Sequence, residues 1–257
     1  MYPILFEVGD WPVYAYGVLL AAAYLLALQF AVFRARRQGV DPTKVMDLGI
    51  YLIIAALVGA KLMLVVVDFD YFMRQPAELL SLVRAGGVFY GGLIAALVVA
   101  LWLVRRYGFS IWTAADLFAP GIALGHVIGR LGCFLAGCCY GKPTSLPWGV
   151  TFTNPVAAEN VGTPLGVALH PTQLYDAGAE LLILTILLVT ERRGRPFAGR
   201  TFWLYMLLYG VSRFIVEIYR GDDRGMFMGL STSQAVSVVI VPLALLMLWR
   251  LRARATA

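Results

Sequence analysis

Seven stretches of this 257-residue chain are apolar for long enough, or nearly so, to cross a lipid bilayer. A hydrocarbon core about 30 Å thick requires roughly 20 apolar residues in a helix that rises about 1.5 Å per residue. Hydrophobic residues make up 60% of the chain and charged residues 14%, which excludes a disordered chain and an ordinary soluble domain. The sequence therefore predicts an all-α integral membrane protein with seven transmembrane helices. They are expected at residues 12–33, 46–67, 87–104, 112–132, 173–190, 201–219 and 232–249.

Lysine and arginine residues gather on one side of these stretches. Thirteen of the 21 lysines and arginines follow the odd-numbered stretches, and this number includes the cluster near the C-terminus. Three more lie within the predicted membrane helices. The five on the opposite side are Arg74, Arg84, Lys142, Arg220 and Arg224. The positive-inside rule then places the N-terminus outside and the C-terminus in the cytoplasm. Because the basic clusters are short and lack interleaved aromatic residues, we expect contacts with anionic lipids and no nucleic-acid binding.

The organisation along the chain is simple. No basic residue precedes Arg34, so the first stretch lacks the charged start of a cleavable signal peptide and is expected to remain as a membrane helix. The longest connection on the outer side, residues 142–170, contains several prolines and predicts a small cap on the outer face. The chain shows no repeat or second soluble region, so residues 1–257 are interpreted as a single polytopic membrane domain.

Two arginines lie within predicted membrane helices, where a guanidinium costs about 2.5–3.5 kcal/mol on insertion scales. Arg213 has Glu217 one turn later and can pair with it. Arg130 has no acid one turn away on its own helix. The phosphate of a lipid head group, held by a planar guanidinium fork, would neutralise it.

Other polar side chains fall at the same outer level. Tyr209 precedes Arg213 by one turn, and Tyr90 opens the third stretch. Each tyrosine alone is equally consistent with an interfacial anchor. His126 precedes Arg130 by one turn, so it is either a helix-packing residue or a group that handles a proton.

Small residues are concentrated in and after the fourth stretch. Gly121, Gly125, Gly129 and Gly132 form a stripe at helical spacing, which predicts close helix packing. The three cysteines, at positions 133, 138 and 139, lie too near one another for a disulfide framework. The only histidines are His126 and His170, so a fourth metal ligand at a recognisable spacing is lacking. We expect the thiols to fill space at the helix end and to hold no metal.

Several motifs together resemble a known family. The segment GRLGCFLAGCCYG at residues 129–141 resembles the signature of bacterial phosphatidylglycerol–prolipoprotein diacylglyceryl transferases. The resemblance extends over most of the chain, and together the motifs are specific. The other matching segments are YGGL at 90–93, HPTQLY at 170–175, YGVSRFIVE at 209–217, Arg220, and the Ser233-Gln234 pair.

The resemblance implies a multi-pass enzyme of the bacterial plasma (inner) membrane. Such an enzyme moves the diacylglyceryl group of phosphatidylglycerol to the lipobox cysteine of a prolipoprotein signal peptide, forms a thioether and releases glycerol phosphate. Neither a metal nor an organic cofactor is implied. Catalytic roles are implied for Arg130, Arg213 and Tyr209. His126 and Tyr90 are further catalytic candidates because of their positions in this sequence. Substrate binding is implied for both arginines and for Gly91, Gly92, Gly141, His170, Gln173, Glu217 and Arg220.

The chain departs from the family pattern at four positions. Cys133, Ala136 and Cys138 replace two asparagines and an acid, and Tyr90 replaces a histidine proposed as the base in several members. His126 is then the nearest candidate base, with Tyr90 positioning the lipid head group. The alternative is a diverged, non-enzymatic protein that binds or translocates phospholipid.

Overall fold

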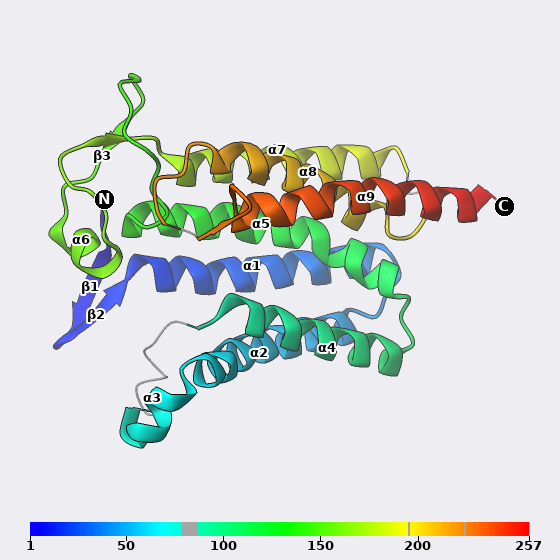
Figure 1. The fold of residues 1–257 in the computed structure, drawn as a ribbon. Coiled ribbons are helices and arrows are strands. Elements are labelled where there is room, and N and C mark those ends of the chain that lie inside the picture. Colours follow the sequence, from blue (N-terminus) through cyan, green and yellow to red (C-terminus); the bar gives the residue numbers. More distant parts are fainter. Residues whose placement is uncertain (79–86, 195, 224, 257) are drawn as a thin grey trace. The chain divides into compact units, whose positions relative to one another are not determined.

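The computed structural model describes residues 1–78, 87–194, 196–223 and 225–256 of the chain, and seven long helices dominate it (Figure 1). Six of them are long and apolar enough to cross a membrane, counted over these described ranges. The prediction of an all-α membrane protein is confirmed at this level. The long helices are α1 (Ala15–Arg37), α2 (Pro42–Val67), α4 (Phe89–Tyr107), α5 (Ile111–Ala136), α7 (Thr172–Arg192), α8 (Arg200–Glu217) and α9 (Thr232–Thr256).

The predicted segments differ from the helices in two respects. Helix α8 is not among the six candidate spans, because its 18 residues include Arg200, Arg213 and Glu217. The first predicted segment starts too early, since residues 12–14 belong to strand β2 (Trp11–Tyr14), which pairs with β1 (Ile4–Val8). Pro12 has no backbone N–H to donate and is tolerated in an edge strand such as this one. Three of the basic residues that were counted to predict the topology, Arg84, Arg195 and Arg224, lie outside the described residues.

The chain divides into two compact units, residues 1–30 with 115–257 and residues 31–114. In the first unit, α8 packs against α7 and α9. Its core is formed by small residues of α5 and large residues of α7 and α8: Ala119, Ala123, Ile183, Leu184, Leu187 and Tyr205. This core holds together the three helices that carry most of the charged residues discussed below.

A buried carboxylate fixes the start of α8. Asp116 of α5 accepts hydrogen bonds from the backbone N–H groups of Gly199 (2.7 Å) and Phe202 (2.8 Å). Gly199 has a φ of 91°, a conformation that favours glycine. The side chain thus satisfies two N–H groups that would have no partner within the helix. The register of α8 relative to α5 is thereby set from its first turn.

The predicted glycine stripe packs α5 against α1. A Cβ on Gly121 would lie 2.7 Å from the carbonyl oxygen of Ala27, and one on Gly132 would lie 3.2 Å from the Cβ of Leu19. Gly125 also faces Ala27, whereas Gly129 has nothing within 4 Å. The packing prediction is therefore confirmed for three of the four glycines, and Gly129 leaves open space beside its neighbour Arg130.

The predicted cap is a small folded lobe. Within residues 142–170, strand β3 (Val150–Thr151) pairs with β4 (Ala168–Leu169), and helix α6 (Pro155–Val161) lies between them in the chain. The Asn154 side chain accepts a hydrogen bond from Val156 N–H at 3.0 Å and so caps α6, with Pro155 at its first position. Strands β1 and β2 and helix α6 gather at one end of this unit, and the C-terminus lies at the other (Figure 1).

A second short hairpin precedes the last helix. Strand β5 (Met226–Phe227) pairs with β6 (Leu230–Ser231), and Gly229 between them has a φ of 83°. The hairpin leads directly into α9, whose second residue is Ser233. The turn therefore determines where the first turn of α9 begins.

The second unit consists of α2, α3 (Phe69–Arg74) and α4. Helices α2 and α4 pack closely through glycines. A Cβ on Gly92 would lie 2.7 Å from the carbonyl oxygen of Ala56, and one on Gly91 would overlap with Met63. Gly91 and Gly92 are therefore required for helix packing, whatever further role they have.

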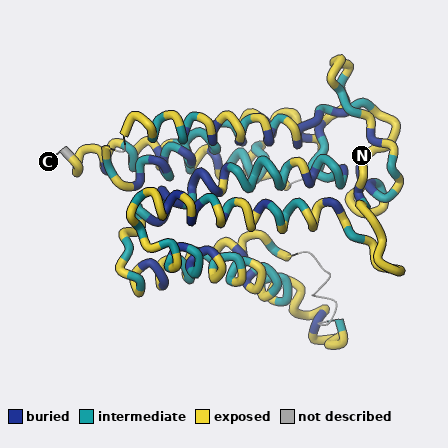
Figure 2. The backbone as a smooth tube through the Cα atoms, turned by 180° about the vertical axis from the view of Figure 1, so that it is seen from behind, coloured by how far each residue is buried: buried dark blue, intermediate teal, exposed yellow. Residues whose placement is uncertain are grey.

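Exposed residues are frequent on most of the long helices, α2, α4 and α9 above all (Figure 2). Many are large and apolar, such as Leu181 and Leu182 on α7 and Val239 and Leu245 on α9. Apolar surface of this extent is unstable against water and is expected where helices face lipid.

Candidate active site

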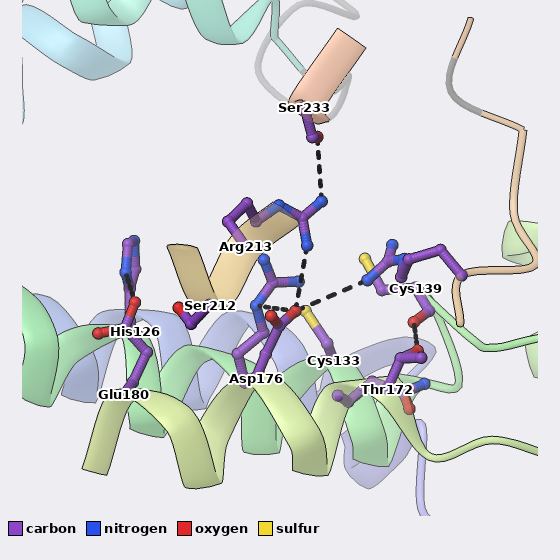
Figure 3. A network of polar contacts seen from close by, with 12 residues as sticks. His126, Cys133, Cys139, Thr172, Asp176, Glu180, Ser212, Arg213 and Ser233 are labelled. Atoms are coloured by element: carbon purple, nitrogen blue, oxygen red, sulfur yellow. Dashed lines mark hydrogen bonds and ion pairs between the residues drawn. The ribbon is translucent and has the colours of Figure 1, made fainter. Parts of the chain in front are cut away.

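Three arginines converge on one buried carboxylate (Figure 3). Asp176, in the second turn of α7, has its Oδ2 atom 3.2 Å from Nε of Arg130, 3.4 Å from Nη1 of Arg213 and 3.8 Å from Nη1 of Arg220. The arginines come from α5, α8 and the residues just after α8. A single acid is thus the shared partner of three guanidinium groups, which gathers their N–H donors around one point.

Two of the arginines also have an acid of their own. Arg213 Nη2 lies 2.6 Å from Glu217 Oε2 and donates to Ser233 Oγ at 3.1 Å. Arg220 donates through Nε and Nη2 to the two oxygens of Asp222, both at 2.8 Å. The predicted pairing of Arg213 with Glu217 is confirmed. The bidentate contact fixes the orientation of the Arg220 guanidinium, and Arg213 is held by its separate contacts with Asp176, Glu217 and Ser233.

Arg130 is held differently. Among the described residues, its only carboxylate contact within 4 Å is the one between Nε and Asp176. Its side chain is 21% exposed, against 6% for Arg213 and 2% for Arg220. The two terminal nitrogens therefore present donors to an incoming anion. As the sequence indicates, Arg130 has no acid on its own helix, and its partner Asp176 comes from α7.

Glu180 lies one helical turn beyond Asp176 on α7 and contacts His126 of α5. His126 Nδ1 is 2.8 Å from Oε1 of Glu180, whose side chain is 5% exposed, while the histidine is 44% exposed. The Tyr205 hydroxyl lies 3.1 Å from the same ring nitrogen. If Nδ1–H donates to the carboxylate, Nε2 is left as a proton acceptor. This arrangement suits a general base that a buried acid orients.

Tyr209 lies beside this pair. Its ring centroid is 5.5 Å from that of His126 and 5.8 Å from that of Tyr205, on which it stacks. Tyr209 and Arg213 are one turn apart on α8, as the sequence predicts. Tyr209 is therefore a neighbour of Arg213 on the same helix and of His126 on α5.

The signature segment leaves α5 through a sharp turn. Gly137 has a φ of 83° and Cys139 a φ of 62°, the latter unusual for a residue with a side chain. Gln173 Nε2 donates to the Cys138 carbonyl at 2.7 Å, and Thr172 Oγ1 donates to the Cys139 carbonyl at 2.8 Å. Both donors are fully buried at the start of α7. The amide of Gln173 thus holds the signature turn, a structural task that the sequence did not reveal.

The segment then runs against two other parts of the chain. Gly141 N–H donates to the His170 carbonyl at 3.1 Å, and a Cβ on Gly141 would lie 2.9 Å from the carbonyl oxygen of Tyr219. Gly141 also forms an isolated bridge with Arg220. Only glycine fits here. Because it has no side chain, the backbone of Arg220 can approach it closely, next to the arginine centre. His170 contacts the Tyr175 hydroxyl through Nδ1 at 3.1 Å.

The three cysteines form a cluster at the same turn. Their sulfur atoms lie within 4.8 Å of one another, and all three are reduced thiols. Hydrogen bonds from the thiols of Cys133 and Cys138 lower the pKa of the Cys139 thiol, and the positive charges of Arg220 and Arg130 lower it further. Hydrogen bonding with Cys133 and Cys139 raises the pKa of the Cys138 thiol. These contacts favour the thiolate form at Cys139 over that at Cys138.

An apolar cavity of about 370 Å³ lies between α8 and α9. It borders Phe214, the neighbour of Arg213, and Ser237, whose hydroxyl donates to the Ser233 carbonyl at 2.9 Å. Ser233 itself accepts a hydrogen bond from Arg213, so the residues lining the cavity are direct neighbours of those that hold this arginine.

The remaining predicted residues belong to the unit of residues 31–114. Tyr90 is the second residue of α4, is 50% exposed, and has its ring centroid 5.6 Å from that of Phe89. Gly91 and Gly92 follow it on the face toward α2. The roles of these three residues in catalysis or binding stay predictions from the sequence.

Asp176 and Glu180 were missed by the sequence reasoning. Both are buried and lie one turn apart on an apolar helix. Acids in such a helix are costly without a partner, and this spacing is the signal that could have found them.

Comparison with known proteins identifies the family. Residues 3–250 match the family described as prolipoprotein diacylglyceryl transferase. A Clostridium tetani protein named phosphatidylglycerol–prolipoprotein diacylglyceryl transferase is 38% identical over 241 residues, which cover 94% of each chain. Relatives with the same name in Finegoldia magna and Synechococcus elongatus are each 31% identical, and the matches cover 93% and 95% of this chain and 91% and 85% of those proteins. The resemblance in the signature motifs is confirmed, and the chain belongs to the prolipoprotein diacylglyceryl transferase family.

Proposed function

We propose that this chain transfers the diacylglyceryl group of phosphatidylglycerol to the lipobox cysteine of prolipoproteins, the first step of lipoprotein maturation. The thiol loses its proton, its sulfur attacks the glyceryl carbon that bears the phosphate, and the carbon–oxygen bond to phosphate breaks. Glycerol phosphate leaves with the electron pair, and a thioether remains. The reaction takes place in a protein of the plasma membrane that has seven spans. Helix α8 crosses the membrane in addition to the six apolar helices, and the N-terminus lies outside.

The observation that carries this proposal is the set of three guanidinium groups around Asp176. A phosphodiester carries one negative charge, and the leaving phosphate gains a second as the bond breaks. Arg130 offers its two terminal nitrogens to the oxygens, while Arg213 and Arg220 add positive charge that their own acids hold in place. Fixed donors of this kind stabilise the transition state more than the ground state.

His126 supplies the base in this proposal. Glu180 accepts from Nδ1 and stabilises the positive charge that the ring acquires when Nε2 takes the thiol proton. Burial makes Glu180 an effective partner, whereas the exposed ring of His126 can reach a substrate. Tyr209 lies close enough to both centres to contact the substrate between them. Tyr90 positions the lipid head group, a role that rests on the sequence alone.

The cavity between α8 and α9 is proposed to hold part of an acyl chain. Its lining is apolar, and it lies next to the residues that hold Arg213. Val238→Trp would fill it. This variant is expected to raise the KM for phosphatidylglycerol several-fold and to leave the KM for the lipobox peptide unchanged. An equal rise in both would argue against a lipid-specific cavity.

Product formation tests the function. Purified protein is incubated with phosphatidylglycerol vesicles and a lipobox peptide, and the thioether-linked product and released glycerol phosphate are quantified by mass spectrometry. A peptide with serine in place of the lipobox cysteine is the control and should give no product. Phosphatidylglycerol binding without any product would instead identify a phospholipid-binding protein.

A further inference from the structure

We infer that Cys133, Cys138 and Cys139 form a binding site for one thiophilic divalent cation of the Zn²⁺ type, held by three thiolates with a fourth position open. This inference is independent of the proposed function, because the thiols are not among the residues assigned to substrate or to the reacting atoms. From the sequence we expected no metal, since no fourth ligand has a recognisable spacing. The spatial cluster is what the sequence did not show.

The distances suit one ion. Zinc binds thiolate sulfur at about 2.3 Å, so three sulfurs on one tetrahedral ion lie about 3.8 Å apart. The three sulfur atoms here already lie within 4.8 Å of one another. The sulfur atoms would have to approach one another by at most about 1 Å to reach this spacing.

The backbone that carries these thiols is fixed in advance. The carbonyls of residues 137, 138 and 139 each accept a hydrogen bond from a buried side chain, at distances of 3.0, 2.7 and 2.8 Å. Cys139 itself has a left-handed backbone conformation, with a φ of 62°. Such a conformation is uncommon for a residue with a side chain and persists where surrounding contacts enforce it. Ligands held by hydrogen bonds of this kind lose little freedom on binding.

The surrounding charge favours thiolates. Three thiolates on a divalent cation carry one net negative charge, which a buried site must compensate. Guanidinium groups of the arginine centre border the cysteine cluster (Figure 3), and their positive charge compensates the net negative charge of the bound thiolates. Cys133 is buried, but Cys138 and Cys139 are only partly buried, so an ion has a route to the sulfurs.

The coordination expected here is incomplete. Within the described residues, the group of potential ligands consists of these three cysteines, with neither His126 nor His170 among them. Water or a small anion would take the fourth position of a Zn²⁺ ion. Three protein ligands with an open position distinguish an exchangeable site from a closed structural one.

Metal binding to the full-length protein tests the inference. Protein purified in detergent under reducing conditions is stripped of metal and titrated with Zn²⁺ by calorimetry, and with Co²⁺ by absorption. We expect one ion per chain and a thiolate-to-cobalt charge-transfer band. Each of Cys133→Ser, Cys138→Ser and Cys139→Ser should weaken binding at least about tenfold, and the triple variant should abolish it. Tyr140→Phe, which keeps all three thiols beside the same turn, should bind as the unmodified chain does.

Folding is checked in parallel by circular dichroism and thermal unfolding, and only variants that match the unmodified chain are compared. A serine variant that unfolds is replaced by the corresponding alanine variant. A stoichiometry well below one ion per chain in the reduced, folded protein would overturn the inference. Equal Zn²⁺ binding by the folded triple variant would also overturn it, because the ion would then lie elsewhere.

Discussion

Asp176 and Glu180 occupy adjacent turns of α7, yet their surroundings differ in kind. Asp176 faces three guanidinium groups, which stay charged at any pH that the protein experiences. Glu180 faces His126 and the hydroxyl of Tyr205, a neighbour that can gain or lose a proton and one that stays neutral. The same carboxylate chemistry can therefore serve two tasks. Asp176 orients permanent positive charge, and Glu180 governs a proton.

The largest expected effect comes from the arginine centre. Arg130→Lys keeps the charge but replaces a planar fork by a point charge, so kcat/KM should fall about 10²- to 10³-fold. Arg213→Lys should be impaired for the same reason. Rates of thioether formation provide the measurement, with helicity by circular dichroism as a check on folding. Arg192→Lys, at the far end of α7, is the matched control and should be nearly normal. Near-normal turnover in the Arg130 and Arg213 variants would assign these arginines to packing.

The proton-handling side should show a smaller and pH-dependent effect. His126→Gln is expected to lower kcat about 100-fold near neutral pH, because the thiol then lacks a base. The deficit should shrink at alkaline pH, since a peptide thiol with an ordinary pKa near 8.5 ionises unaided there. The comparison is a profile of kcat against pH for both proteins. A deficit of constant size across this range would exclude the proposed role.

Tyr90 should contribute less than His126. Removing one hydroxyl that positions a head group is expected to raise the KM for phosphatidylglycerol by less than about tenfold, as Tyr90→Phe would show in initial-rate measurements. If His126→Gln is active and Tyr90→Phe is inactive, the assignment of the base is wrong. The proton would then pass through the tyrosine or the lipid phosphate.

The smallest effect is expected from the thiols. Serine at all three cysteine positions should leave helicity unchanged and kcat/KM within about threefold, because the turn is held by backbone carbonyls that serine retains. The rate of thioether formation by the triple variant, compared with that of the unmodified chain, tests this prediction. A loss as large as that of Arg130→Lys would place a thiol in the reaction itself.

The contacts that could be predicted from the sequence are those within one helix. The seven long helices and the ion pair of Arg213 with Glu217 follow from local apolar runs and one-turn spacing. The contact of Asp176 with Arg130 joins residues 46 positions apart, and Glu180 meets His126 over 54. Such pairs depend on how α5 and α7 pack, which spacing along the chain does not contain.

The cysteine cluster illustrates the same limit at short range. Its members lie within seven residues, but their convergence depends on the left-handed turn at Gly137 and Cys139 and on side chains from α7. The strand at residues 12–14 was missed for another reason, since a short apolar stretch before a helix has no periodicity of its own.

The orientation in the membrane rests on the flanking charges. Single cysteines introduced between Lys142 and His170 into the thiol-free variant should react with an impermeant reagent applied from the outer side. If these cysteines react only from the cytoplasmic side, the protein has the opposite topology, and the proposed site lies in the other leaflet.

The pH dependence of two matched variants tests the central distinction most directly. Asp176→Asn and Glu180→Gln each remove one charge and keep the shape, and kcat/KM for thioether formation is measured from pH 5.5 to about 9.5, across the range where a histidine and a thiol titrate. We predict that Asp176→Asn lowers the whole profile by a roughly constant factor, because permanent charge is misplaced. Glu180→Gln should shift the acidic limb of the profile and approach the unmodified rate at alkaline pH. The opposite pattern, or two parallel profiles, would contradict the assignment of charge placement to Asp176 and proton transfer to the pair of His126 and Glu180.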